Sequence, residues 1–140
     1  MPGSASVPQK PPQTISVRVR YAETDKMGVV YHANYFVWFE IARCELLRSV
    51  GTSYRELEST GIGLPVIEAH CEYKMPARYD DELEVRAWGE LMSGARVEFR
   101  YEIRRPSDGA VNATGRTVHA SVDASGRPCR LPDHVRELLQ

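Results

Sequence analysis

Residues 21–43 read YAETDKMGVVYHANYFVWFEIAR, and this stretch decides how the chain is organised. An acidic loop with a single glycine leads from the end of a strand into an aromatic-rich helix. Asp25 and Gly28 stand just ahead of the expected helix start. This order places a carboxylate near main-chain N–H groups that have no partner within the helix. Such an arrangement suits attack on a polarised carbonyl group.

The helix is predicted to run over residues 33–50. Its apolar residues recur at spacings of four and three along one stripe, formed by Tyr35, Phe39, Ala42, Leu46 and Val50. Asn34 is expected to cap the helix start, and Gly51 to end the helix. Trp38 and Phe36 widen the apolar surface beyond the stripe and are expected to leave an exposed flank. We therefore expect a sheet and a partner subunit to cover this helix together.

Alternation of polar and apolar residues predicts five strands. They are expected at residues 15–21, 66–73, 82–87, 96–104 and 117–122. In the second strand one face carries Ile67, Ala69, Cys71 and Tyr73. In the fifth strand Val118, Ala120 and Val122 alternate with Thr117, His119 and Ser121.

Turns and short helices complete the predicted order of elements. Turn-forming residues at 93–94 and 106–109 make neighbouring strands antiparallel. Ser53, three residues before Glu56, favours a short second helix, and Pro132 opens a terminal helix. One long helix against one antiparallel sheet gives an α+β domain of two layers.

The length, composition and net charge of the chain predict one domain that does not attract nucleic acid electrostatically. The chain has 140 residues, 42% of them hydrophobic and 26% charged, which is ordinary for a soluble globular protein. The formal net charge of −1 gives no overall attraction for nucleic acid or an anionic membrane. We expect no nucleic-acid partner and no stable membrane insertion, since no apolar run approaches the ~18 residues of a membrane span.

The terminus and the cysteines favour a cytoplasmic location. Residues 1–13 contain four prolines and no apolar core of a signal peptide, so they are predicted to be a flexible arm. Residues 14–140 are expected to form the single folded domain. Cys44, Cys71 and Cys129 are odd in number and have no Cys-x-x-Cys spacing, which favours reduced thiols.

The residue order from Asp25 resembles a known signature. Asp-x-x-Gly-x-Val-Tyr-His-x-Asn-Tyr, followed by an aromatic run and Glu-x-Ala-Arg, is similar to the motif of the 4-hydroxybenzoyl-CoA thioesterase family. The similarity is closest to its Tol-Pal-associated acyl-CoA thioesterase branch. A second match, Pro-x-x-x-x-Asp, runs from Pro76 to Asp81. The resemblance covers residues 15–122. It implies the hotdog fold, in which an antiparallel five-stranded sheet wraps around a long central helix.

The resemblance also implies a hydrolase that cleaves acyl-CoA to coenzyme A and a carboxylic acid. It puts the catalytic carboxylate at Asp25, as general base or nucleophile, although spacing alone would favour a loop-bracing aspartate. It aligns the main-chain N–H of His32 with the donor to the thioester carbonyl. Glu40 is the fallback catalytic residue, and a salt bridge to Arg43 is its structural alternative. Glu23 is expected to be solvated or hydrogen-bonded locally.

Seven further positions are expected to contact the substrate: Gly28, Tyr31, Asn34, Gly63, Leu64, Lys74 and Arg78. Gly28 would allow positive φ or close approach of the ligand. Tyr31 and Asn34 would line the acyl pocket, or pack at the helix start. Lys74 and Arg78 would meet the phosphates of coenzyme A, or remain solvated charges. Gly63 and Leu64 fall where the family brings a neighbouring subunit's backbone toward the thioester.

The resemblance implies a homo-oligomer, either a dimer or a dimer of dimers, with active sites between subunits. No metal or redox cofactor is implied, because coenzyme A is part of the substrate and the four histidines lack a metal-ligand spacing. Two other functions stay open. A hotdog dehydratase of 3-hydroxyacyl thioesters would need an acid–base pair, such as His32 with Asp25 or Glu40. A non-catalytic acyl-CoA-binding module would leave the thioester intact.

Overall fold

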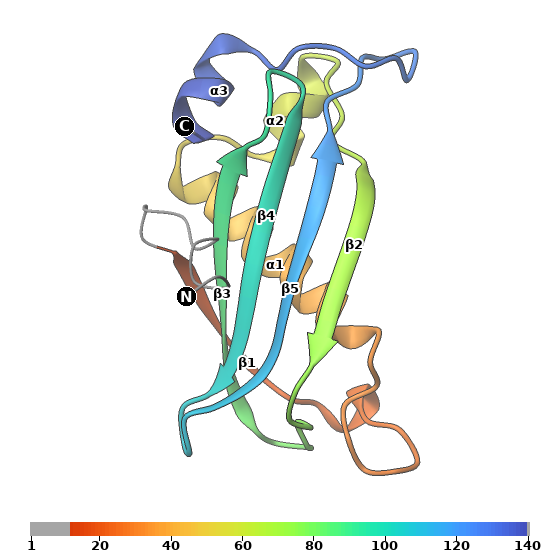
Figure 1. Cartoon of the computed structure of the whole chain (residues 1–140), viewed down its shortest axis with the longest axis vertical. Coiled ribbons are helices and arrows are strands. Elements are labelled where there is room, and N and C mark those ends of the chain that lie inside the picture. Colours follow the sequence, from red (N-terminus) through yellow and green to blue (C-terminus); the bar gives the residue numbers. More distant parts are fainter. Residues whose placement is uncertain (1–11, 140) are drawn as a thin grey trace.

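A five-stranded antiparallel sheet and the long helix α1 (Asn34–Ser49) form the two layers of the molecule (Figure 1). The structure is a computed structural model and describes residues 12–139. Its strands are β1 (Gln13–Arg18), β2 (Val66–Tyr73), β3 (Glu82–Leu91), β4 (Arg96–Arg105) and β5 (Ala110–Ala120). They lie in the order β1-β3-β4-β5-β2, so β1 and β2 are the edges. The predicted α+β arrangement is confirmed.

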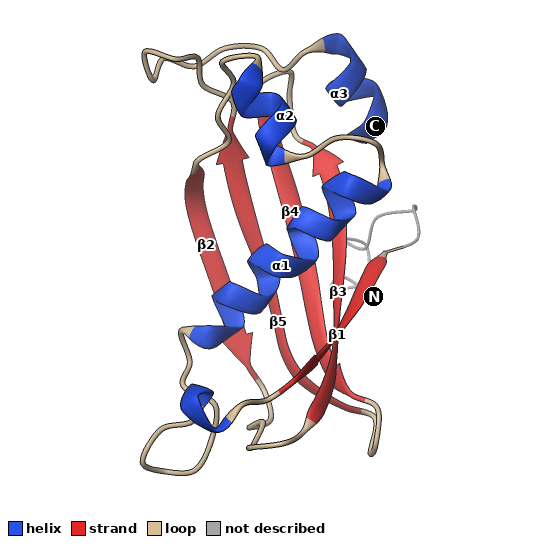
Figure 2. Ribbon diagram, turned by 180° about the vertical axis from the view of Figure 1, so that it is seen from behind, coloured by secondary structure: helices blue, strands red, loops and turns tan. Residues whose placement is uncertain are grey.

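Helix α1 crosses one face of the sheet and packs mainly on β3 and β1 (Figure 2). The predicted stripe is buried from Tyr35 to Leu46. The expectation of an exposed flank at Trp38 was wrong, because its side chain is only 2% exposed. The exposed apolar residues of this helix are instead Val37 and Ile41, at 52% and 44%.

The start of α1 differs from the predicted cap. Ala33 occupies the N-cap position, and no side chain caps it. Asn34 is the first helical residue, and its side-chain amide donates to the main-chain oxygen of Glu23 at 2.9 Å. The amide therefore ties the helix start to the preceding loop instead of capping the helix. At the other end Gly51 has φ of 97°, as expected of a residue that ends a helix.

The bounds of three strands also differ from the prediction, and β3 continues four residues further, to Leu91. β1 ends at Arg18, and Tyr21 begins a short 3-10 turn, η2 (Tyr21–Glu23), with its side chain exposed. β5 begins at Ala110, directly after the predicted hairpin turn. Residues 110–116 read AVNATGR and show no regular alternation, so the pattern revealed only the second half of this strand.

The second half of β5 has a polar inner face, contrary to its sequence pattern. Thr117 lies opposite Phe99, and His119 lies opposite Val97, so both polar side chains point toward the core. Both are buried. A buried polar group is tolerated when it is hydrogen-bonded, and these two residues are bonded to each other.

Gly115 allows α1 to approach β5 closely. A Cβ atom at this position would lie 2.5 Å from the Phe39 ring and 2.8 Å from the main-chain oxygen of His70. Phe39 stacks on Tyr101, with ring centroids 4.3 Å apart and planes 10° from parallel. Any side chain at Gly115 would therefore push the helix off the sheet.

Two short helices close one end of the molecule. α2 (Tyr54–Ser59) starts where the sequence predicts, and the Ser53 hydroxyl accepts the Glu56 N–H at 3.1 Å. α3 (Asp133–Leu139) packs against β3. Most of the predicted arm lies outside the described residues, and Gln13 already belongs to β1. Within residues 12–139, no helix is both long enough and apolar enough to cross a membrane.

Candidate active site

Asp25 lies on a tight turn in the loop that leads to α1. Its main-chain N–H donates to Val29, and its main-chain oxygen accepts the N–H of Gly28, both at 2.9 Å. Gly28 has φ of 79°, a conformation that favours glycine. One carboxylate oxygen of Asp25 accepts the N–H of Met27 at 2.9 Å. The other oxygen forms no hydrogen bond with any residue in 12–139, so it is free to meet water or a substrate carbonyl.

The second sequence motif packs directly against this loop. Val29 forms a bridge with Arg78, and the N–H of Val30 donates to Ala77 at 2.8 Å. Ala77 is fully buried, which anchors the pairing in the core. The fold thus brings the Asp25 loop and the Pro76–Asp81 segment together, although they are distant in sequence.

The helix start supplies main-chain donors. Within residues 12–139, the N–H groups of His32 and Ala33 donate no hydrogen bond, as expected ahead of the first helical turn. The hydroxyl of Tyr73, at the end of β2, donates to the main-chain oxygen of His32 at 2.9 Å. Burial raises the pKa of Tyr73 to about 12, so this donor stays protonated. Tyr73 therefore fixes the peptide next to the expected thioester donor.

The side chains of His32 and Tyr31 form an exposed aromatic contact. Their ring centroids are 4.5 Å apart, and the Tyr73 ring lies nearly perpendicular to the His32 ring with centroids 6.3 Å apart. The His32 ring makes no hydrogen bond or ion pair with the described residues. This geometry favours a packing role for the imidazole, and the main-chain N–H of His32 stays the expected donor to a substrate.

Glu23 serves the structure of the loop. Its carboxylate is buried and accepts the Arg20 main-chain N–H at 2.7 Å and the Trp38 indole N–H at 3.3 Å. The prediction of a locally hydrogen-bonded role is confirmed. Because both oxygens are used in this way, Glu23 is poorly placed to act on a substrate.

The two basic candidates lie at the same end of the molecule as Asp25. Lys74 directly follows Tyr73, and its ammonium lies 3.7 Å from the carboxylate of Glu72. Arg78 is exposed, and its guanidinium forms no ion pair among residues 12–139. Arg78 is therefore free to bind an anionic ligand, whereas Lys74 already interacts with Glu72.

Gly63 and Leu64 lie far from Asp25 within one chain. They precede β2, whereas the Asp25 loop lies beside the opposite end of that strand (Figure 1). Gly63 is held there by paired main-chain hydrogen bonds with Val122, at 2.9 and 3.0 Å. A single copy of the chain therefore does not assemble all of the predicted site residues.

Glu40 does not form the predicted salt bridge. Its side chain is exposed on α1, whereas Arg43 is buried and donates to the hydroxyls of Tyr54 and Tyr101 at 2.6 and 3.2 Å. The expectation was wrong because Arg43 points into the core and Glu40 points to solvent. Three residues of separation did not place them on a common face.

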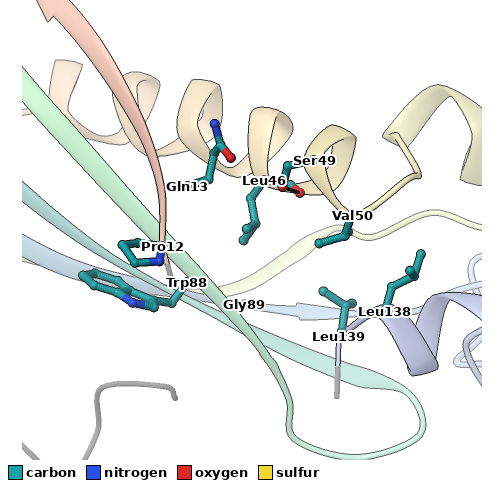
Figure 3. A pocket seen from close by; sticks show the side chains of 9 residues that line it. All are labelled: Pro12, Gln13, Leu46, Ser49, Val50, Trp88, Gly89, Leu138 and Leu139. Atoms are coloured by element: carbon teal, nitrogen blue, oxygen red, sulfur yellow. Dashed lines mark hydrogen bonds between the residues drawn. The ribbon is translucent and has the colours of Figure 1, made fainter. Parts of the chain in front are cut away.

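A cavity of about 310 Å³ lies at the far end of α1 (Figure 3). Leu46 and Val50 line it from the helix, Trp88 and Gly89 from β3, and Leu139 from α3. None of its lining residues is charged. It offers no acid or base and is remote from Asp25, so we do not regard it as the reaction site. In the described part of the chain, no three His, Cys, Asp or Glu side chains gather as metal ligands.

Tyr73 is the residue of the candidate site that sequence reasoning missed. The alternation of β2 placed Tyr73 on one face of the strand and indicated nothing more about its role. Only the pairing of β2 with β5, and the path of the loop before α1, bring its hydroxyl to His32.

Known proteins resemble this chain in sequence and fold. Residues 19–139 match the family described as Thioesterase-like superfamily. The acyl-CoA thioester hydrolase YbgC of Escherichia coli O6:H1 is 34% identical over 119 residues, covering 85% of this chain and 89% of that protein.

Solved structures agree with the sequence comparison. A 1,4-dihydroxy-2-naphthoyl-CoA thioesterase from Synechocystis superimposes with a TM-score of 0.85 at 25% identity, covering 91% of this chain and 95% of that one. The DHNA-CoA thioesterase of Staphylococcus aureus gives 0.81 at 37% identity, covering 86% and 80%. The resemblance inferred from the Asp25 motif is confirmed. The chain belongs to the thioesterase-like superfamily, and its fold is the hotdog fold.

Proposed function

We propose that this thioester hydrolase acts on acyl-CoA, with Asp25 as its catalytic carboxylate. The observation that carries the proposal is the loop before α1. It holds a carboxylate with one free oxygen a few residues ahead of the unused main-chain N–H of His32. The relatives named as acyl-CoA or aromatic acyl-CoA thioesterases support the same substrate class.

The reaction follows from these two groups. The N–H of His32, at the positive end of the 16-residue helix α1, donates to the thioester carbonyl oxygen. As general base, Asp25 takes a proton from the water that attacks the carbonyl carbon. As nucleophile, it forms a mixed anhydride that water then opens. In either route the C–S bond breaks, coenzyme A leaves as a thiolate, and the acyl group becomes a carboxylic acid.

Arg78 and Lys74 are proposed to bind the phosphates of coenzyme A. Both lie at the end of the molecule that carries Asp25, and Arg78 has no competing ion pair among the described residues. A guanidinium suits phosphate recognition because it donates several hydrogen bonds in a planar fork.

We also propose that two copies of the chain share the site. β2 is an edge strand, and its apolar residues Ile67 and Tyr73 are 44% and 47% exposed. If β2 pairs antiparallel with the β2 of a second copy, the start of one strand meets the end of the other. Gly63 and Leu64 of one subunit then approach the Asp25 loop of its neighbour, which one chain alone does not achieve.

A substrate screen tests the activity itself. The purified oligomer is mixed with short, long and aromatic acyl-CoAs and with a 3-hydroxyacyl-CoA, and free thiol and enoyl absorbance are followed. Hydrolysis predicts free thiol from at least one of them. Enoyl absorbance without thiol would instead indicate the dehydratase. That function has less support, because no histidine in residues 12–139 is hydrogen-bonded to a carboxylate. Tight binding without turnover would indicate the binding module and contradict the proposal.

A further inference from the structure

Arg43 is a buried cation without a carboxylate partner. Its side chain is 8% exposed and forms no ion pair with any residue in 12–139. It donates instead to the phenol oxygens of Tyr54 and Tyr101. Burying a charge costs free energy, and well-packed apolar residues often stabilise a core as much as a buried charged group does. The arrangement around Arg43 therefore invites a functional explanation.

A chain of hydrogen bonds continues from Arg43 across the sheet. The Tyr101 hydroxyl lies 2.6 Å from Oγ1 of Thr117, and that oxygen lies 2.9 Å from Nε2 of His119. Nδ1 of His119 then lies 2.9 Å from the main-chain oxygen of Leu64. We call these bonds, from Arg43 to Leu64, the Arg43 relay. It joins α1, β4 and β5 to the segment before β2.

The direction of every bond in the relay is fixed by its two ends. The Leu64 oxygen can only accept, so Nδ1 of His119 carries the proton. Burial, which outweighs the hydrogen bond to Leu64, lowers the pKa of His119 to about 4. The ring is therefore neutral at pH 7, and its Nε2 accepts from Thr117. Thr117 accepts from Tyr101, and Tyr101 accepts from Arg43, which can only donate.

The relay and a direct bond hold one segment at both of its ends. Tyr54, the first residue of α2, accepts the Nε–H of Arg43 at 2.6 Å. Leu64, at the end of the connection after α2, is held through the relay. Gly63 is fixed beside it by its two main-chain bonds to Val122. The two ends of residues 54–64 are thus both linked by hydrogen bonds to the Arg43 guanidinium, directly at Tyr54 and through the relay at Leu64.

We propose that Arg43 is a positioning residue, which acts through the relay to hold Gly63 and Leu64 in the geometry that receives acyl-CoA in the neighbouring subunit's site. This inference rests on the proposed thioesterase function and deepens it. Arg43 touches no reacting atom in this account. Its effect is to keep the substrate-facing segment in one conformation, so breaking the relay weakens substrate binding more than it slows the chemical step.

Thr117 offers the sharpest test, because valine has nearly its shape but lacks the hydroxyl. Thr117→Val interrupts the relay, whereas Thr117→Ser keeps the hydroxyl. Val85→Ala, in the core of β3, is the control for general destabilisation. Losing a buried hydrogen bond predicts that Thr117→Val raises KM for acyl-CoA at least about fivefold with a smaller change in kcat. Thr117→Ser is expected to keep the wild-type KM. Val85→Ala is expected to lower the Tm and to leave the KM at the wild-type value.

Two measurements test the relay without an assay of enzyme activity. Long-range ¹H–¹⁵N spectra of the wild-type oligomer are expected to show neutral His119 protonated at Nδ1. Amide exchange of Gly63 and Val122 is expected to be at least about fivefold faster in Thr117→Val than in Val85→Ala. His119 protonated at Nε2, unchanged exchange, or a wild-type KM in folded Thr117→Val would overturn the inference. If the wild-type chain cleaves no acyl-CoA, the thioesterase proposal fails, and the spectra and exchange rates still decide the relay.

Discussion

Two acidic residues in the same loop show how environment assigns different roles. The carboxylate of Glu23 is buried, and its hydrogen bonds join η2 to α1. The carboxylate of Asp25 is half-buried, and one oxygen braces the turn through Met27 while the other makes no bond to residues 12–139. The loop-bracing and catalytic interpretations of Asp25 are therefore compatible. A single residue can hold the turn with one oxygen and act on water with the other.

His119 predicts a pH dependence of stability. Because its pKa is about 4 in the folded chain and near 6.5 otherwise, the unfolded chain binds more protons between these values. Neutral His119 therefore contributes to the free energy of unfolding in full above about pH 6.5. This contribution, roughly 3 kcal/mol in total, is lost as the pH falls toward 4. We expect the Tm of the wild type to fall more steeply over this window than that of His119→Gln, which cannot titrate. If the Tm of both proteins falls equally with pH, His119 is not the group that causes the pH dependence.

At the scale of elements, local patterns were predictable and contacts between elements were not. The stripe of α1 and the alternation of β4 are periodic, so both elements were predicted close to their observed bounds. The first half of β5 was missed because small and polar residues replace the alternation there. The Asp25–His32 part of the candidate site is contiguous in sequence, so a local motif was enough to propose it. The contact of Tyr73 with His32 depends on strand pairing, which no local pattern encodes.

The crossing of α1 over β5 predicts a severe effect at Gly115. In Gly115→Ala the new methyl group would overlap the Phe39 ring and the His70 carbonyl. Overpacking of this kind typically costs about 1–3 kcal/mol, which exceeds the small gain from a stiffer unfolded chain. Thermal unfolding should show a clearly lower Tm. Gly94→Ala is the control, because the three atoms nearest to its Cβ all belong to the flexible side chain of Arg130. An equal Tm for both variants would mean that α1 does not pack this closely.

For the whole molecule, β2 and α1 leave apolar side chains exposed in a single copy of the chain. Ile67 on β2 and Val37 and Ile41 on α1 are all more than 40% exposed. Each Å² of apolar surface that association buries is worth ~25 cal/mol, so association with a second copy through these side chains would be stabilised. The same association would bring Gly63 and Leu64 to the Asp25 loop.

Charge introduced at one of these side chains is predicted to separate the subunits. We expect light scattering to find the wild type as a dimer or larger, and Ile67→Lys to shift it toward monomer with loss of thiol release. Met92→Lys is the matched control, since Met92 is also an exposed apolar residue but follows β3, away from β2. A wild-type monomer with full activity at micromolar concentration would refute both the oligomer and the shared site.

The most direct test of the whole account is the turnover of acyl-CoA by Asp25→Asn in the intact oligomer. The substitution keeps the shape of the side chain and removes the base or nucleophile. We expect kcat to fall about 10²–10⁴-fold. Asp80→Asn, in a neighbouring exposed turn, and His32→Gln, which keeps its main-chain N–H, should both stay within about tenfold of the wild type. Near-normal turnover by folded Asp25→Asn would contradict the account and make Glu40 the next candidate.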